Sequence, residues 1–176
     1  MLKHFSQTRL EVIEINNDRI EIFEPGALLL LPSSLTIVFA RNNRFEIGPY
    51  MLDVNSLQEV NLKGNVLSKW NGPVEGVESI TKLDLSNNYC HHINTDFFKH
   101  LRSLKKLDMS YNNLQWVLYN DKNGSIFRPL NNLTHLNLIK NNLIWLPSKI
   151  FTGLSSLQHL NLSRNIIRDM ILDLRI

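Results

Sequence analysis

An eleven-residue pattern, L-x-x-L-x-L-x-x-N-x-L, returns seven times along this 176-residue chain. The frames start at residues 10, 35, 57, 80, 104, 133 and 157, so successive starts lie 22 to 29 residues apart. Apolar and polar residues alternate at the beginning of each frame, which is the period of a half-buried β-strand. One such unit cannot bury its apolar side alone. We therefore expect the units to stack as neighbouring strands about 4.8 Å apart.

This period and this signature are those of a leucine-rich repeat solenoid. We predict one α/β-type solenoid domain over residues 1–176, with a curved parallel β-sheet on the concave face and irregular or short helical returns on the convex face. The returns repeat as well, because a phenylalanine stands six residues and a leucine three residues before three of the frames. These are Phe98, Phe127 and Phe151, and Leu101, Leu130 and Leu154. The register predicts an aromatic spine parallel to the leucine core.

The ninth position of the frame is asparagine in six of the seven repeats. These residues are Asn43, Asn65, Asn88, Asn112, Asn141 and Asn165. The chain turns away from the sheet at this point and leaves main-chain groups unpaired, and an amide can both donate and accept hydrogen bonds. We predict a structural asparagine ladder. Asp18 replaces asparagine in the first frame, and an ionised carboxylate cannot donate, so we expect a weaker rung there.

The ends of the chain lack two features that complete solenoids carry. Solenoids generally need a polar terminal unit, and extracellular ones usually end in cysteine-rich caps. Neither is present, and the last frame stops before its return segment completes. We therefore expect a piece of a longer protein that is uncapped at both ends. Cys90 is the only cysteine, and its inward-pointing position predicts a buried small hydrophobe and not a reactive thiol.

Composition disfavours several functional classes. The formal charge of +3 is small and scattered, so nucleic-acid binding is disfavoured and stays open only as a minor alternative. No apolar stretch reaches the roughly 20 residues of a membrane span, and the first ten residues lack the apolar core of a signal peptide. His91 and His92 have no cysteine or carboxylate cluster at metal-ligand spacing. With no catalytic or phosphate-binding motif in the sequence, we predict no enzyme, no cofactor and no metal.

Two stretches carry a family resemblance. Residues 131–165 (NNLTHLNLIKNNLIWLPSKIFTGLSSLQHLNLSRN) resemble the 24-residue repeat class of animal extracellular receptors and matrix proteins. Residues 80–114 (ITKLDLSNNYCHHINTDFFKHLRSLKKLDMSYNNL) resemble the ectodomain of a Toll-like receptor in the phrases LDLSNN and LDMSYNNL, in the FF before H-L-x-x-L and in their irregular repeat length. The resemblance implies a recognition module of innate immune signalling that dimerises, on the extracellular or endosomal-lumenal side of a single-pass membrane receptor. An adhesion or matrix protein and an intracellular scaffold remain alternatives.

Outward strand positions of the last four frames form the candidate binding surface. The third positions hold Lys82, Lys106, His135 and His159, and the fifth positions hold Asp84, Asp108, Asn137 and Asn161. These columns either form a surface for a protein or microbial ligand that uses charge to set the register, or neutralise one another through cross-strand pairs. In the first two frames Val12, Ile37 and Phe39 point outward. They form either a partly apolar contact site or a surface covered by further repeats.

Two histidines suggest a pH-dependent contact. His135 and His159 are predicted to lie one strand apart, and their ordinary pKa of about 6.5 lies within the endosomal range. Two protonated imidazoles at strand spacing would repel each other. The pair is either a pH switch for binding or dimerisation, or exposed polar filler.

The fifth return, Val117–Pro129, is about five residues longer than the others. It either contacts a ligand or a second chain, or is a tolerated loop, because added loop length costs little. Three N-x-S/T sequons mark candidate glycosylation sites at Asn123, Asn132 and Asn161. Asn123 lies at the tip of the long loop, whereas a glycan on Asn161 would cover part of the concave face.

Overall fold

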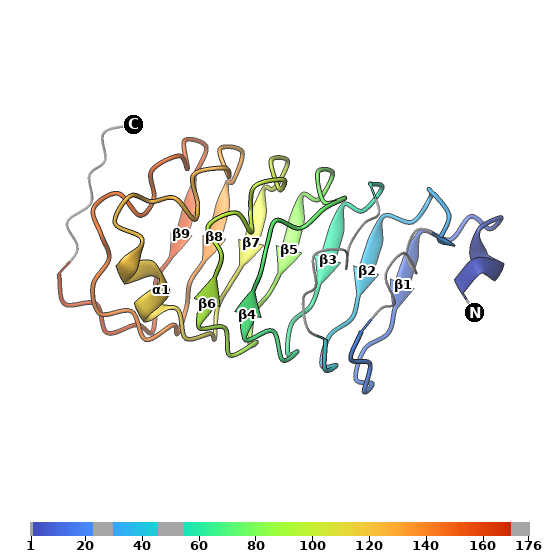
Figure 1. The fold of residues 1–176 in the computed structure, drawn as a ribbon, viewed down its shortest axis with the longest axis horizontal. Helices are drawn as coiled ribbons and strands as arrows, with labels where there is room; N and C mark the ends of the chain where they lie inside the picture. Colours follow the sequence, from blue (N-terminus) through green and yellow to red (C-terminus); the bar gives the residue numbers. More distant parts are fainter. Residues whose placement is uncertain (1, 23–29, 46–54, 170–176) are drawn as a thin grey trace.

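The computed structural model describes residues 2–22, 30–45 and 55–169. Its main feature is a seven-stranded parallel sheet in which consecutive repeats lie side by side (Figure 1). The strands are β1 (Val12–Glu14), β2 (Ile37–Phe39), β3 (Glu59–Asn61), β5 (Lys82–Asp84), β7 (Lys106–Asp108), β8 (His135–Asn137) and β9 (His159–Asn161). Each strand covers positions three to five of one frame. The predicted parallel sheet and solenoid are confirmed.

The strand register keeps equal frame positions side by side. Val38 pairs with Val60, Leu83 with Leu107, and the same rule holds along the whole sheet. The middle residue of each strand points inward and is buried in the five inner strands, and it is partly exposed in β1 and β9, the two ends of the stack. The first and last residues of each strand in this sheet, which are frame positions three and five, therefore lie on the outer, concave side.

In the described residues, the segments outside the main sheet contain only short regular elements, as predicted. A second sheet joins β4 (Lys69–Trp70) to β6 (His92–Ile93), α1 spans Gln115–Asn120, and a 3₁₀ turn spans Leu2–Phe5. The described residues contain no helix long and apolar enough to cross a bilayer. Cys90 is buried, and its desolvation raises the thiol pKa to about 12, so it behaves as a core residue.

The aromatic spine runs through the returns at the register that the sequence indicates. Phe98 and Phe127 are fully buried with ring centroids 6.1 Å apart, and Phe127 and Phe151 stack at 6.3 Å. Trp70 and Phe97 extend this packing towards the N-terminal repeats, because the Trp70 ring lies 5.6 Å from Phe97. Aromatic pairs at these distances contribute about 0.5–1.5 kcal/mol beyond the area that they bury.

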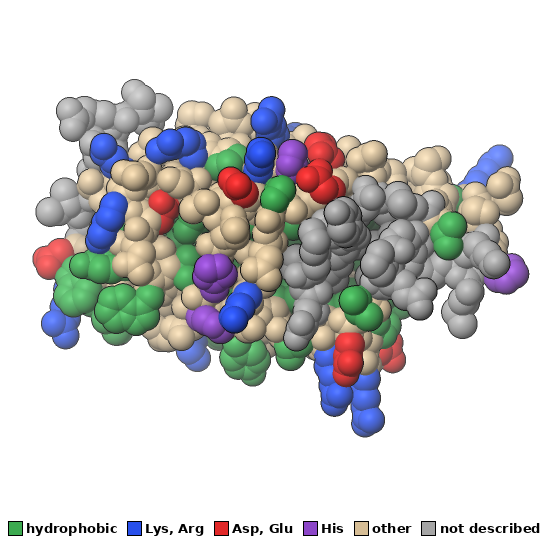
Figure 2. Space-filling view, in the orientation of Figure 1, with side chains coloured by type: hydrophobic (Ala, Val, Ile, Leu, Met, Phe, Trp, Pro, Cys, Tyr) green, Lys and Arg blue, Asp and Glu red, His purple; other side chains and the backbone are tan. Residues whose placement is uncertain are grey.

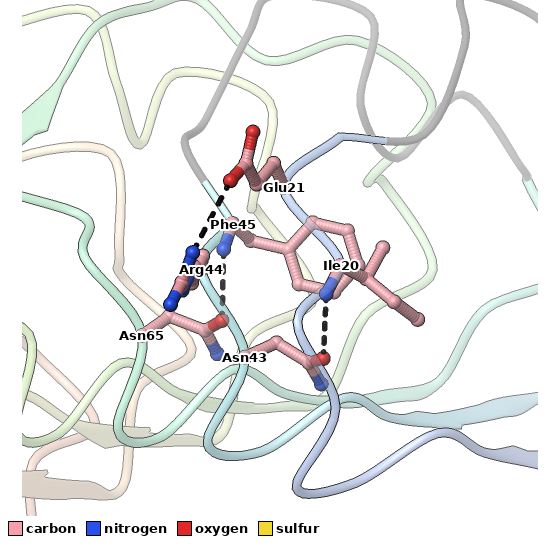
Figure 3. Close-up of polar contacts among 6 residues, drawn as sticks. All are labelled: Ile20, Glu21, Asn43, Arg44, Phe45 and Asn65. Carbon is pink, nitrogen blue, oxygen red and sulfur yellow. Dashed lines mark hydrogen bonds and ion pairs between the residues drawn. The ribbon is translucent and has the colours of Figure 1, made fainter.

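Each ladder asparagine bonds to the main chain of the repeat before it. Its Nδ2 donates to a carbonyl of that repeat at 2.6–3.1 Å in all six rungs. In five of the six rungs the side-chain oxygen accepts a main-chain N–H of that preceding repeat, as from Ile20 to Asn43 at 3.2 Å and from Phe45 to Asn65 at 3.0 Å (Figure 3). Asp18 is exposed, and its carboxylate has no hydrogen bond within the described part of the chain.

The ladder changes where the fifth return begins. Leu114 is the N-cap of α1, and the Oδ1 atom of Asn141 has no partner in the part of the chain that the structure describes. Gln115, the first residue of α1, links the fifth repeat to the sixth, because its side-chain oxygen accepts the Ile144 N–H, while its Nε2 has no partner among the described residues. The long return therefore starts by replacing one ladder bond with a helix.

A left-handed residue follows every strand, at the eighth position of the frame. Asn17, Asn42, Gly64 and Asn87 occupy it in the first four frames, and Tyr111, Lys140 and Arg164 in the last three, with φ between 52° and 72°. Glycine and asparagine tolerate this region, whereas other residues lose roughly 1–2 kcal/mol there. Sequence analysis missed this requirement because the consensus leaves the position unspecified.

Candidate recognition surface

The concave face carries a hollow of about 430 Å³ that crosses β3, β5, β7, β8 and β9. Six of the seven predicted ligand-binding residues line it, namely Lys82, Asp84, Lys106, Asp108, His135 and His159. Phe39 does not line it. That side chain is partly buried in β2, and the Arg41 guanidinium lies 5.5 Å from its ring centroid. Val12 is exposed and Ile37 partly exposed, so an apolar area borders the hollow on the N-terminal side.

The third-position column is only partly neutralised. Lys82 pairs with Glu59 on the neighbouring strand at 3.0 Å, and sequence analysis had not included Glu59 in the site. Lys106 lies directly beside Lys82 and His135 in the register, and no carboxylate pairs with it among the described residues. A positive charge therefore stands open in the middle of the hollow.

The carboxylates of the fifth-position column accept hydrogen bonds from neighbouring amide side chains and from residues of the following turn, and not from the lysines. Asp84 Oδ2 accepts a hydrogen bond from Asn61 at 3.2 Å, and Asp108 Oδ2 accepts one from Asn137 at 2.8 Å. The other oxygen of Asp108 accepts the Ser110 N–H at 2.8 Å and hydroxyl at 2.6 Å. Cross-strand pairing between these lysines and aspartates, one of the two interpretations of the sequence, is absent in the described part of the chain. Lys106 and the partly exposed Asp84 and Asp108 therefore line the hollow without an ion-pair partner among the described residues.

His135 and His159 lie in direct contact. Their rings stack with centroids 4.3 Å apart and an interplanar angle of 24°. The Thr134 hydroxyl lies 2.9 Å from His135 Nδ1. Partial desolvation, then the neighbouring His159 and Lys106, lower the pKa of His135 below its ordinary value.

Two segments, residues 78–118 and 120–169, match the family described as leucine rich repeat, and together they cover just over half of the chain. The chain belongs to the leucine-rich repeat family. It is 34% identical over 126 residues to "Toll-like receptor 4" of Pinctada imbricata, a match that covers 72% of this chain and 14% of that protein. The leucine-rich repeat chain thus spans about one seventh of the length of this relative.

A solved structure has the same fold. The crystal structure of human 5T4 (Wnt-activated inhibitory factor 1, trophoblast glycoprotein) superposes with a TM-score of 0.73 at 22% identity, covering 88% of this chain and 59% of the other. At this identity the likeness concerns the leucine-rich repeat fold alone.

The long return of the fifth leucine-rich repeat is a folded element and not an open loop. Both carboxylate oxygens of Asp121 accept main-chain N–H groups, from Ser125 and Ile126, each at 2.8 Å. Gly124 has a left-handed φ of 64°, and a Cβ atom there would collide with the Lys149 carbonyl. Trp116, on the exposed side of α1, is 63% exposed. The return therefore presents a fixed surface.

The three sequon asparagines are all exposed. Asn132 donates through Nδ2 to the Arg102 carbonyl at 2.8 Å, and Asn161 lies in β9 at the rim of the concave hollow. Asn123 lies in the long return, where its carbonyl accepts the Arg128 guanidinium at 2.7 Å.

Sequence analysis missed one group of potential metal ligands. Glu75, Glu78 and His100 place their ligand atoms within 4.8 Å of one another. His100 faces both carboxylates, with Nε2 at 3.7 Å from Glu75 and Nδ1 at 3.8 Å from Glu78. His91 and His92 are exposed and belong to no such group in the described residues. Counting backwards from each frame start would have placed the two glutamates and His100 on adjacent returns.

Proposed function

We propose that this chain is a ligand-recognition part of a Toll-like pattern-recognition receptor ectodomain, on the extracellular or endosomal-lumenal side, in innate immune signalling. The observation that carries the proposal is the 34% identity over 126 residues to a Toll-like receptor. The repeat-level resemblance of residues 80–114 supports the same assignment. Binding, without enzymatic activity, is the function that an open sheet supports, because no enclosed site desolvates a general acid or base there.

The concave hollow is the proposed contact site for a protein or microbial ligand. Lys106 stands without a carboxylate partner in the described residues, and Asp84 and Asp108 keep one side towards the hollow. Fixed charges of both signs impose a register on a ligand and raise its association rate more than its affinity. The exposed face of the long return offers a second contact for the ligand or for a receptor dimer.

The test compares two charge-matched variants in binding to immobilised microbial fractions, namely cell-wall polysaccharide, lipid extract and secreted protein. Lys82→Gln/Lys106→Gln removes two charges from the hollow, and Lys63→Gln/Lys149→Gln removes two exposed charges elsewhere. We expect the native chain and the control to bind at least one fraction equally, and the concave variant about tenfold more weakly, a loss of about 1.4 kcal/mol. Absence of binding to every fraction, or equal binding by both variants, would contradict the proposal.

An extracellular adhesion or matrix protein is the second candidate, because the leucine-rich repeat fold, which trophoblast glycoprotein shares, does not by itself distinguish such a protein from a receptor. Binding to immobilised collagen or fibronectin through the same hollow, with no response to the microbial fractions, would favour this alternative.

A further inference from the structure

A second hollow lies on the return side, away from the concave sheet. It measures about 520 Å³, and its lining residues are Thr95, Asp96, Lys99, Arg102, Ser125, Arg128, Pro129 and Asn131. We call it the return groove. These residues come from the fourth and fifth returns only, and each of the two returns forms one wall. On the face shown in Figure 2, Lys and Arg side chains gather towards the upper edge, beside acidic and histidine side chains.

The return groove has an excess of positive charge. Lys99, Arg102 and Arg128 are exposed, and among the described residues Asp96 is the only carboxylate that lines the groove. None of the three cations forms an ion pair among the described residues. A net charge of about +2 within one hollow favours an anionic occupant.

Carboxylates on the same and the preceding returns face groups other than the groove cations. Both carboxylate oxygens of Asp121 accept hydrogen bonds from main-chain N–H groups of its own return, those of Ser125 and Ile126. Glu75 and Glu78, on the preceding return, both face His100. The cations of the groove therefore remain available to a ligand.

The cations also stand on fixed backbone. The Arg128 guanidinium donates to the Asn123 carbonyl at 2.7 Å, and the Arg102 carbonyl accepts the Asn132 amide at 2.8 Å. Buried Ile126 and Phe127 anchor the wall of the fifth return in the core. The Arg128 guanidinium is therefore held in place, and such a group loses less side-chain entropy when it binds a planar or tetrahedral anion through paired hydrogen bonds.

The lining favours a sulfated glycan over other anions. Pro129 is the only apolar lining residue, whereas protein-docking sites usually centre on buried aromatic or aliphatic anchors. No aromatic ring lines the groove to stack a nucleobase, as single-stranded nucleic-acid sites require. Hydroxyl and amide groups of Thr95, Ser125 and Asn131 suit the hydroxyls of a sugar. We propose that the return groove binds a sulfated polysaccharide through Lys99, Arg102 and Arg128, independently of the concave surface.

The test measures binding of fluorescein-labelled heparin octasaccharide to the folded chain, freed enzymatically of N-glycans, by anisotropy between about 50 and 200 mM salt. Lys99→Gln/Arg102→Gln and Arg102→Gln/Arg128→Gln remove two charges from the groove. Lys140→Gln/Arg164→Gln removes two exposed charges at the turn edge near Tyr111. We expect either groove variant to bind at least about tenfold more weakly and to lose about 1 to 2 units of the salt slope, because two contacts disappear, while the control stays within about twofold.

Circular dichroism checks that each variant is folded, and the two groove variants separate charge loss from any change in the loop that Arg128 contacts. Fully desulfated heparin should bind much more weakly than heparin. The proposal is overturned by no heparin binding to the native chain, by equal losses in the control and groove variants, or by full retention in both groove variants. Tighter binding of poly-glutamate or of an oligo-dT strand than of heparin would overturn the assignment to a glycan.

Discussion

At the residue scale, Asn112 shows how one amide joins two successive repeats. Its Nδ2 donates to Leu85 and Met109 carbonyls at 3.1 and 3.0 Å, and its oxygen accepts the Cys90 N–H at 2.8 Å. The side chain is buried, so water cannot replace these bonds. Removing one partner of a buried hydrogen bond costs the desolvation of the other partner.

We expect Asn112→Ala to lower the free energy of unfolding by about 3 kcal/mol, from two to three lost hydrogen bonds at about 1–1.5 kcal/mol each. Urea unfolding followed by far-UV circular dichroism measures this change. Asn120→Ala, at the exposed end of α1, is the matched control and should change stability by less than about 0.5 kcal/mol. Equal effects at the two positions would show that the ladder contributes little.

The left-handed residues after the strands predict a substitution that stabilises the chain. Lys140 has φ of 52° at the position where Asn17, Asn42 and Asn87 stand in other repeats. Lys140→Asn should raise the free energy of unfolding by about 0.5 kcal/mol, because relief of about 1 kcal/mol of strain outweighs the loss of an exposed cation–π contact with Tyr111. Lys105→Asn, at an exposed position before a strand, should bring no gain. Thermal unfolding of the two variants and of the native chain measures the effect. A melting temperature for Lys140→Asn below that of the native chain would contradict the expectation.

At the scale of the strands, β8 and β9 bring His135 and His159 into ring contact. The pKa of His135 is lower in the folded chain than in the unfolded chain, so the unfolded chain binds more protons in acid. The stability that this residue supports is therefore complete above its ordinary pKa of about 6.5 and is lost as the pH falls from there towards the folded pKa. Both histidines line the concave hollow, so protonation of His135 can also alter ligand binding there.

We expect the melting temperature of the native chain to fall between pH 7.5 and 5.5 by more than that of His135→Gln. His91→Gln, an exposed histidine away from the hollow, should keep the native pH dependence. The functional counterpart is ligand binding or dimerisation over the same pH range, compared between the native chain and His135→Gln/His159→Gln. If the native chain and the histidine variants show identical pH profiles in both experiments, the two histidines are exposed polar residues without a role in pH dependence.

The elements differ in how well the sequence predicts them. The strands follow from leucine spacing, because burial requires the same positions to face inward in every repeat. The contact between His135 and His159 follows from the same register. The return groove follows only in part, since its hollow depends on how two returns of unequal length fold beside each other. Lys99 and Arg128 both lie five residues before a frame start, so a backward alignment would have placed them together.

At the scale of the whole molecule, each repeat is stabilised by its neighbours through the sheet, the asparagine ladder and the aromatic spine. Nearest-neighbour contacts of this kind make a central position more consequential than a terminal one. Phe127 is fully buried between the rings of Phe98 and Phe151, whereas Phe151 is partly exposed. The two phenylalanines occupy the same register position, so they form a matched pair.

We expect Phe127→Ala to cost about 3–5 kcal/mol, the range for a buried phenylalanine, and Phe151→Ala to cost roughly half of that because less of its surface leaves water. Phe127→Leu, a milder change, keeps the comparison possible if the alanine variant does not fold. Urea unfolding gives the free energies, followed in parallel by tryptophan fluorescence and far-UV circular dichroism. Because Phe127 links the fourth and sixth repeats, its loss should also separate the transitions seen by the two probes. Coincident transitions with equal costs for both phenylalanines would mean that the spine is not the path by which the repeats support one another.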